Sequence, residues 1–215
     1  MTCDLESIAP SSELFRLGRA PSPWDWNDWA NAGPDGTFGN RWDDPESKYR
    51  VLYGCSQRLG SFMETLGRFP GDPKVQSELE MIELEPGEED SALPPGHLRL
   101  TDWLEKRLMG RAEFRGNFAA VGRSRSLTYL QNRLSNLIGG YGLREIDGAA
   151  IRQTAPRSLT QLISRLVYEC STDEGARQFD GIHYLSRHGR RVRELGGLRT
   201  RSNRAARRCN HPVRR

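Results

Sequence analysis

Residues 39–66 read Gly-Asn-Arg-Trp-Asp-Asp-Pro over 39–45, Tyr-Arg-Val-Leu-Tyr over 49–53 and Ser-Gln-Arg-Leu-Gly-Ser-Phe-Met-Glu-Thr-Leu over 56–66. The short apolar run at 49–53 predicts a buried strand. Ser56 is a residue type that caps helices, and the apolar residues after it recur at helical spacing. These apolar residues are Leu59, Phe62, Met63 and Leu66. The stretch therefore predicts a turn, a buried strand and a helix in direct succession.

Three side chains of this stretch carry useful chemistry: Arg41 in the turn, Tyr53 at the end of the strand and Glu64 beside the apolar helix face. A guanidinium binds phosphate oxygens through two parallel hydrogen bonds, and a phenol ring stacks on a flat heterocycle. A partly buried carboxylate stabilises positive charge that develops during a reaction. The same residues also have an explanation without a ligand. Arg41 could pair with Asp43 or Asp44, Tyr53 could belong to the core, and Glu64 could be a solvated helix residue.

Three further segments have the pattern of regular structure. Residues 13–17 alternate, which predicts a strand that contains Arg16. Residues 158–167 place apolar side chains at the 3.6-residue period of a helix. Residues 179–186 predict a turn into a short strand that ends at Ser186. We therefore expect a single α/β (α+β) domain, with helices flanking a mixed twisted sheet.

Residues 74–150 are expected to form a helical or mixed insertion in this domain. Within them, residues 100–108 have helical spacing, with Thr101 as the capping residue. Residues 127–138 form a second amphipathic pattern that two glycines, Gly139 and Gly140, bring to an end.

The charge of the chain is unevenly distributed. The whole chain has a net charge of +4, but residues 187–215 hold eleven arginines and one acid, so the rest carries about −6. The basic pI of about 9.0 therefore belongs to the tail. An acidic folded part is not typical of a nucleic-acid-binding domain, and we expect nucleic-acid contact only nonspecifically, through the tail.

The cysteines and histidines show no metal-binding or disulfide pattern. Cys3, Cys55, Cys170 and Cys209 are scattered without a C-x-x-C pair, which predicts four reduced thiols in a cytoplasmic protein. No apolar run approaches the roughly 18 residues of a membrane span. We therefore expect neither a metal site nor a membrane partner. The histidines are equally scattered, at His97, His183, His188 and His211.

The order and local context of the candidate residues resemble the RES-domain family, over residues 13–188. The members are NAD-degrading toxins of bacterial toxin–antitoxin systems and are similar to ADP-ribosyltransferases. The resemblance implies an ADP-ribosyltransferase-like fold and NAD as the substrate, cleaved by an NAD phosphorylase or glycohydrolase, with inorganic phosphate or water as acceptor. It implies no other cofactor. The likeness is carried by Phe15-Arg16-Leu17, Gly-Asn-Arg41-Trp, Val-Leu-Tyr53, Met-Glu64-Thr and Phe-Asp-Gly-Ile-His-Tyr-Leu-Ser186-Arg.

The resemblance also assigns roles to the residues. Glu64 is the catalytic carboxylate, Arg41 binds the phosphates, and Tyr53 holds the nicotinamide end of NAD. Ser186 completes the pocket, and Arg16 matches an early arginine that is a second phosphate contact.

Several alternatives stay open at this point. Ser164 competes with Ser186 for the place of the site serine. The chain could transfer ADP-ribose to a macromolecule, or it could be an inactive, non-enzymatic remnant of the family. The family implies a helix-turn-helix (Xre-like) antitoxin as protein partner, and the sequence leaves the oligomeric state open.

The likeness to the family stops after residue 188. Members continue with a closing strand similar to Asn-Trp-Ala-Leu-Phe-Glu, whereas residues 189–215 of this chain are rich in arginine. We expect the closing strand to be missing and the tail to be disordered. With suitable codons, a one-base shift over residues 190–198 encodes Asp-Glu-Ser-Ala-Asn-Trp-Ala-Gly-Phe. This leads to the hypothesis that the tail is frame-shifted, in which case the activity of this chain would be reduced or absent.

Overall fold

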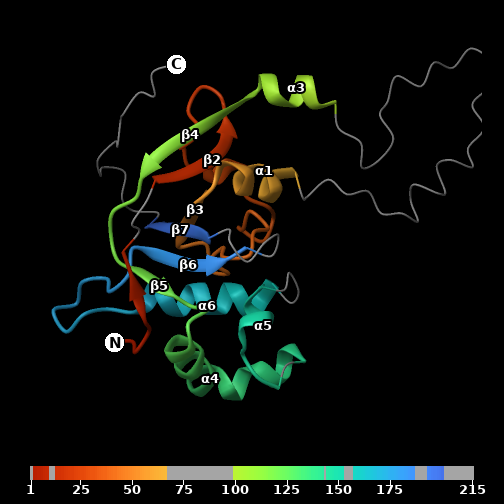
Figure 1. Cartoon of the computed structure of the whole chain (residues 1–215). Coiled ribbons are helices and arrows are strands. Elements are labelled where there is room, and N and C mark those ends of the chain that lie inside the picture. The colour runs from red at the N-terminus through yellow and green to blue at the C-terminus, as the bar shows by residue number, and fades with distance from the viewer. Residues whose placement is uncertain are drawn as a thin grey trace, which may run out of the picture.

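The computed structural model describes residues 2–9, 13–66, 99–142, 144–152 and 157–186, and the backbone of residues 193–200. Within these residues seven strands form one sheet, in the order β1-β5-β6-β7-β3-β2-β4, with helices beside it (Figure 1). The predicted α+β class with a mixed sheet is confirmed. The strands are β1 (Ser7–Ile8), β2 (Glu13–Arg19), β3 (Tyr49–Cys55), β4 (Arg107–Glu113), β5 (Phe118–Ala120), β6 (Gly181–Leu185) and β7 (Arg193–Thr200). The α-helices are α1 (Arg58–Leu66), α3 (Leu100–Glu105), α4 (Ser124–Ile138), α5 (Gly148–Arg152) and α6 (Arg157–Glu169).

The register of the sheet determines which side chains share a face. β5 and β6 run parallel, and the other neighbouring strands are antiparallel. Tyr53 of β3 lies across from Gly196 of β7, which in turn lies across from Ile182 of β6. Because side chains alternate along a strand, Tyr184 and Ser186 project to the same face as Ile182. Tyr53, Tyr184 and Ser186 therefore belong to one face of the sheet.

The main hydrophobic core covers this face. α6 contributes Leu159, Ile163 and Val167, which pack with Ile182 of β6, and α4 lies beyond α6 (Figure 1). The opposite face carries a smaller cluster of apolar residues. Its members are Leu14 and Phe118, with Ile8, Trp24 and Phe114 packed against them.

Most of the predicted elements are confirmed. The strands expected at 13–17, 49–53 and 179–186 are β2, β3 and β6, and the helices expected after Ser56, at 127–138 and at 158–167 are α1, α4 and α6.

The prediction of a purely helical insertion at residues 74–150 is wrong, and the mixed alternative agrees with the described part of this segment. Residues 74–98 lie outside the described residues, but β4 and β5 lie in the remainder and belong to the sheet. β4 pairs with β2 along its whole length, and β5 joins β1 to β6. The predicted helix over 100–108 also ends early, at Glu105. Its N-cap is Arg99 and not the predicted Thr101. The apolar spacing continued across the junction of a helix and a strand, which hid the boundary.

The expectation of a missing closing strand is also wrong. Residues 193–200 form β7, which pairs with β3 on one side and β6 on the other. The hydrogen bonds between strands are made by backbone N–H and C=O groups and do not depend on the side chains. A segment with an unfavourable side-chain pattern can therefore still pair with β3 and β6. With β1 and β7 in the sheet, the domain extends beyond the predicted residues 13–188. Residues 201–215 lie outside the described residues, and the frameshift hypothesis stays a prediction that the nucleotide sequence tests.

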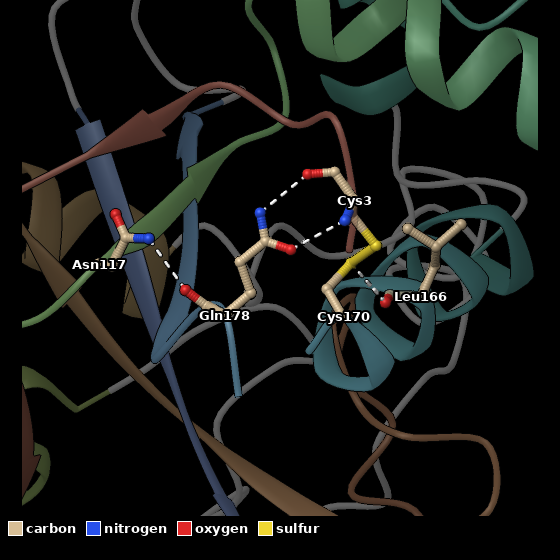
Figure 2. The surroundings of a disulfide bond; sticks show 5 residues. All are labelled: Cys3, Asn117, Leu166, Cys170 and Gln178. Carbon is tan, nitrogen blue, oxygen red and sulfur yellow. Dashed lines mark hydrogen bonds between the residues drawn. A yellow bond between two sulfur atoms is a disulfide. The ribbon is translucent and has the colours of Figure 1, made fainter. Parts of the chain in front are cut away.

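The prediction of four reduced thiols is wrong for two of the cysteines. Cys3 and Cys170 form a disulfide, with their Cα atoms 5.6 Å apart (Figure 2). The Gln178 side chain also fixes the backbone of Cys3 beside the disulfide. It accepts a hydrogen bond from the Cys3 N–H at 2.9 Å and donates one to the Cys3 carbonyl at 2.8 Å. A search for closely spaced cysteines misses this pair because 167 residues separate its members.

The described helices include none with the length and apolar character needed to cross a membrane.

Candidate active site

α1 directs Glu64 toward the sheet. Gly60 and Ser61 are the buried residues of this helix, whereas Leu59 is 66% exposed. Glu64 follows the two buried residues by four and three positions, so it lies on the same side of the helix. The predicted apolar face is therefore not the side that packs closest to the sheet. The small side chains of Gly60 and Ser61 allow α1 to approach the sheet closely. Glu64, on the same side of the helix, therefore also points toward the sheet.

Glu64 meets Ser186 at the end of β6. The Ser186 hydroxyl donates a hydrogen bond to Oε1 of Glu64, and Ser186 is 2% exposed. A hydrogen bond to a carboxylate is stronger than one between neutral groups and restricts the carboxylate's orientation. The structure thus brings together a predicted catalytic acid and a predicted site serine that are 122 residues apart in the chain.

Arg41 lies against two aromatic rings. Its guanidinium carbon is 5.6 Å from the ring centroid of Trp42 and 5.5 Å from that of Tyr184, which suits cation–π attraction. One terminal nitrogen donates to the carbonyl of Ile151 in α5. The Nε atom is buried and has no hydrogen-bond partner within the described parts of the chain. The guanidinium is therefore held in place while part of its donor capacity is unused.

The two aspartates considered as partners of the site arginine hold the surrounding turn. Oδ2 of Asp43 accepts from the backbone N–H groups of Phe38 and Asn40, at 2.9 and 2.7 Å. The carboxylate oxygens of Asp44 lie 3.1 and 3.2 Å from one terminal nitrogen of Arg165 on α6. Both carboxylates thereby fix the shape of the turn that carries the arginine.

Tyr53 connects to this turn through Trp42. The backbone N–H of Trp42 donates to the Tyr53 hydroxyl at 3.2 Å. The indole ring of Trp42 is fully buried, and its centroid lies 4.9 Å from that of Tyr184. Trp42 therefore contacts Arg41, Tyr53 and Tyr184 at once. Ser186, two residues after Tyr184 and directly beyond β6, lies on the same face of the sheet, so the carboxylate–serine pair is on the side where these aromatic residues lie.

The Arg16 side chain lies on the opposite face of the sheet from the Tyr53 ring and Ser186, although it bonds to the Tyr53 backbone. Its Nε donates to the Pro23 carbonyl at 2.8 Å, and a terminal nitrogen donates to the backbone carbonyl of Tyr53 at 3.0 Å. Leu14, two residues earlier in the strand, packs in the cluster of Trp24 on the opposite face of the sheet. The structure therefore places Arg16 where it ties the segment around Pro23 to β2 and β3.

Ser164 is fully buried beneath Trp42. It accepts a hydrogen bond from the Tyr49 hydroxyl at 2.8 Å and donates one to the Trp42 carbonyl at 2.7 Å. Burial raises the pKa of the Tyr49 hydroxyl well above its usual value, so this phenol stays protonated. Of the two competing serines, Ser186 is the one that bonds to the predicted catalytic acid.

Two residues that link the site were not predicted from the sequence. Trp42 follows Arg41 in the sequence and Tyr184 precedes Ser186 by two residues, but neither was selected as a site residue. The signal available for Tyr184 is its spacing of two from Ser186, which puts both side chains on one face of a strand.

Within the described residues, no group of three or more His, Cys, Asp and Glu side chains is placed to hold a metal ion. Comparison with protein-family models, curated proteins and solved structures finds no match for this chain.

Proposed function

We propose that this chain cleaves the nicotinamide–ribose bond of NAD, in a domain of the RES type with an ADP-ribosyltransferase-like fold. One observation carries the proposal. Trp42 contacts Arg41, Tyr53 and Tyr184, and the Glu64–Ser186 pair lies on the same face of the sheet, with Ser186 two residues after Tyr184. A phosphate-binding cation, an aromatic hydroxyl and an oriented carboxylate are the groups that this reaction uses.

The proposed reaction breaks the bond between the ribose C1 and the nicotinamide nitrogen. Nicotinamide leaves with the electron pair of that bond, and the ribose carbon acquires oxocarbenium character. The Glu64 carboxylate stabilises this positive charge, and the hydrogen bond from Ser186 keeps the carboxylate in position. Water or phosphate then forms the new bond to the carbon and releases a proton when water attacks. The products are nicotinamide and either ADP-ribose or its 1″-phosphate.

Arg41 and Tyr53 bind the two parts of the dinucleotide in this proposal. The guanidinium has a buried Nε without a hydrogen-bond partner among the described residues, and a phosphate oxygen would supply the acceptor. The Tyr53 ring holds the nicotinamide end. The proposal includes a cytoplasmic NAD pool as the substrate source and a helix-turn-helix antitoxin as the protein partner.

The test is incubation of the purified chain with NAD labelled in its adenine half, with and without phosphate. We expect NAD loss with label in free ADP-ribose, or in its 1″-phosphate when phosphate is the acceptor. Label attached to protein or nucleic acid would indicate transfer of ADP-ribose instead. No loss of NAD from folded protein would contradict the proposal and indicate an inactive member of the fold.

A further inference from the structure

A chain of buried hydroxyl groups ends at the backbone of Trp42. Tyr49 of β3 donates to Ser164 of α6 at 2.8 Å, and Ser164 donates to the Trp42 carbonyl at 2.7 Å. All three residues are at most 2% exposed. A serine hydroxyl has one proton, and because Tyr49 donates to Ser164, that proton is available to the Trp42 carbonyl. The direction of the chain is therefore fixed.

The other backbone group of Trp42 is held by the predicted site itself. Its N–H donates to the Tyr53 hydroxyl at 3.2 Å. The N–H and the carbonyl of one buried residue are thus bound by two different elements, β3 and α6. Its indole ring is in contact with Tyr184 and lies beneath the Arg41 guanidinium.

We infer that Ser164, supported by Tyr49, is a positioning residue that sets the placement of Arg41 and Tyr53 through the backbone of Trp42. The inference rests on the proposed function. Ser164 itself does not contact Arg41, Tyr53 or Glu64 in any hydrogen bond of the described structure, so it acts only through Trp42. Loss of its hydroxyl would leave the Trp42 carbonyl buried without this donor and allow the turn to move.

Two variants separate this role from a general contribution to stability. Ser164→Ala removes the donor to Trp42. Thr160→Val is the matched control, because Thr160 is also buried, lies one turn earlier on α6 and bonds only to the Arg157 carbonyl of its own helix. We expect S164A to raise KM for NAD about fivefold with kcat within about twofold, since substrate binding is loosened while Glu64 is untouched. T160V should keep the wild-type KM, even if it lowers stability as much.

A double-mutant cycle tests the path through Trp42. Tyr53→Phe removes the acceptor of the Trp42 N–H, so S164A and Y53F act on the same backbone segment. We expect the effect of S164A on KM to be smaller in the Y53F background than in the wild type. If S164A does not fold, Tyr49→Phe replaces it, because Y49F removes only the first hydroxyl of the chain.

The outcomes are distinct. A wild-type chain that consumes no NAD contradicts the proposed function, and the inference is lost with it. A wild type that cleaves NAD while S164A and Y49F keep the KM of T160V overturns the inference alone, and so does strict additivity of S164A and Y53F. A raised KM with non-additivity supports the positioning role.

Discussion

Arg41 is held between two aromatic rings, and this placement needs a guanidinium. A lysine ammonium would neither stack in the same way on Trp42 and Tyr184 nor offer parallel donors to a phosphate. We expect Arg41→Lys to raise KM for NAD about tenfold, a loss of roughly 1.4 kcal/mol of binding free energy. Steady-state kinetics with NAD measure it.

Arg50 provides the control for this substitution. Its guanidinium carbon lies 5.9 and 5.6 Å from the rings of Trp26 and Trp29, so it is also an arginine packed on tryptophans. Arg50 alternates with Val51 and Tyr53 along β3 and therefore projects from the opposite face. Arg50→Lys should leave KM unchanged, and an equal rise in KM in both variants would contradict a specific role for Arg41.

For single residues, the sequence was a better guide to which side chains form the candidate site than to which side chains contact one another. Arg41, Glu64 and Ser186 could be selected from their chemistry and local context, and the structure brings Glu64 and Ser186 into contact. The hydrogen bond from Ser164 to Trp42 could not be predicted, because it joins residues 122 apart whose meeting depends on how α6 packs. Arg16 was selected in the same way, but strand alternation puts it on the other face.

Single elements were predictable where periodicity and boundaries agreed. α6 and α4 have a clear apolar period and defined ends, and both were predicted. The orientation of α1 was not, since packing of the small residues Gly60 and Ser61 outweighs the apolar residue Leu59. β4 was missed because its first residues continue the apolar spacing of α3.

β2 requires a glycine where the segment around Pro23 crosses it. A Cβ atom at Gly18 would lie 2.3 Å from the carbonyl oxygen and 2.5 Å from the Cα of Pro23, and backbone atoms cannot move aside as a side chain can. We expect Gly18→Ala to lower the free energy of unfolding by about 1–3 kcal/mol, as overpacking does. Urea denaturation measures this change.

Gly139 is the matched control for that substitution. It has helical dihedral angles at the end of α4, and a Cβ there would meet no atom within 4 Å. Gly139→Ala should leave stability unchanged or raise it by up to about 1 kcal/mol. Equal stability of the two variants would contradict the close approach of Pro23 to β2.

At the scale of the whole molecule, contacts between segments distant in sequence join the described parts of the chain. β7 completes the sheet between β3 and β6, and the disulfide joins Cys3 near the start of the chain to the end of α6. Neither was predictable from local pattern, because strand pairing uses the backbone and disulfide pairing depends on the final fold.

The disulfide should stabilise the fold by restricting the unfolded chain. We expect the double variant Cys3→Ser and Cys170→Ser to lose about 2–5 kcal/mol of unfolding free energy relative to the oxidised protein. Reducing agent should lower the stability of the wild type and leave the double variant unchanged. Peptide mapping without reduction should recover Cys3 and Cys170 in one linked product, and alkylation of both before reduction would contradict the bond.

The central claim is that the Glu64 carboxylate, oriented by Ser186, drives cleavage of NAD. The most direct measurement is the rate of NAD consumption by Glu64→Gln, beside Glu105→Gln as an exposed glutamate on α3. Because the amide carries no charge to stabilise the oxocarbenium-like carbon, we predict that E64Q loses about 10²–10³-fold in kcat while E105Q matches the wild type. An E64Q protein that consumes NAD at the wild-type rate would contradict the claim.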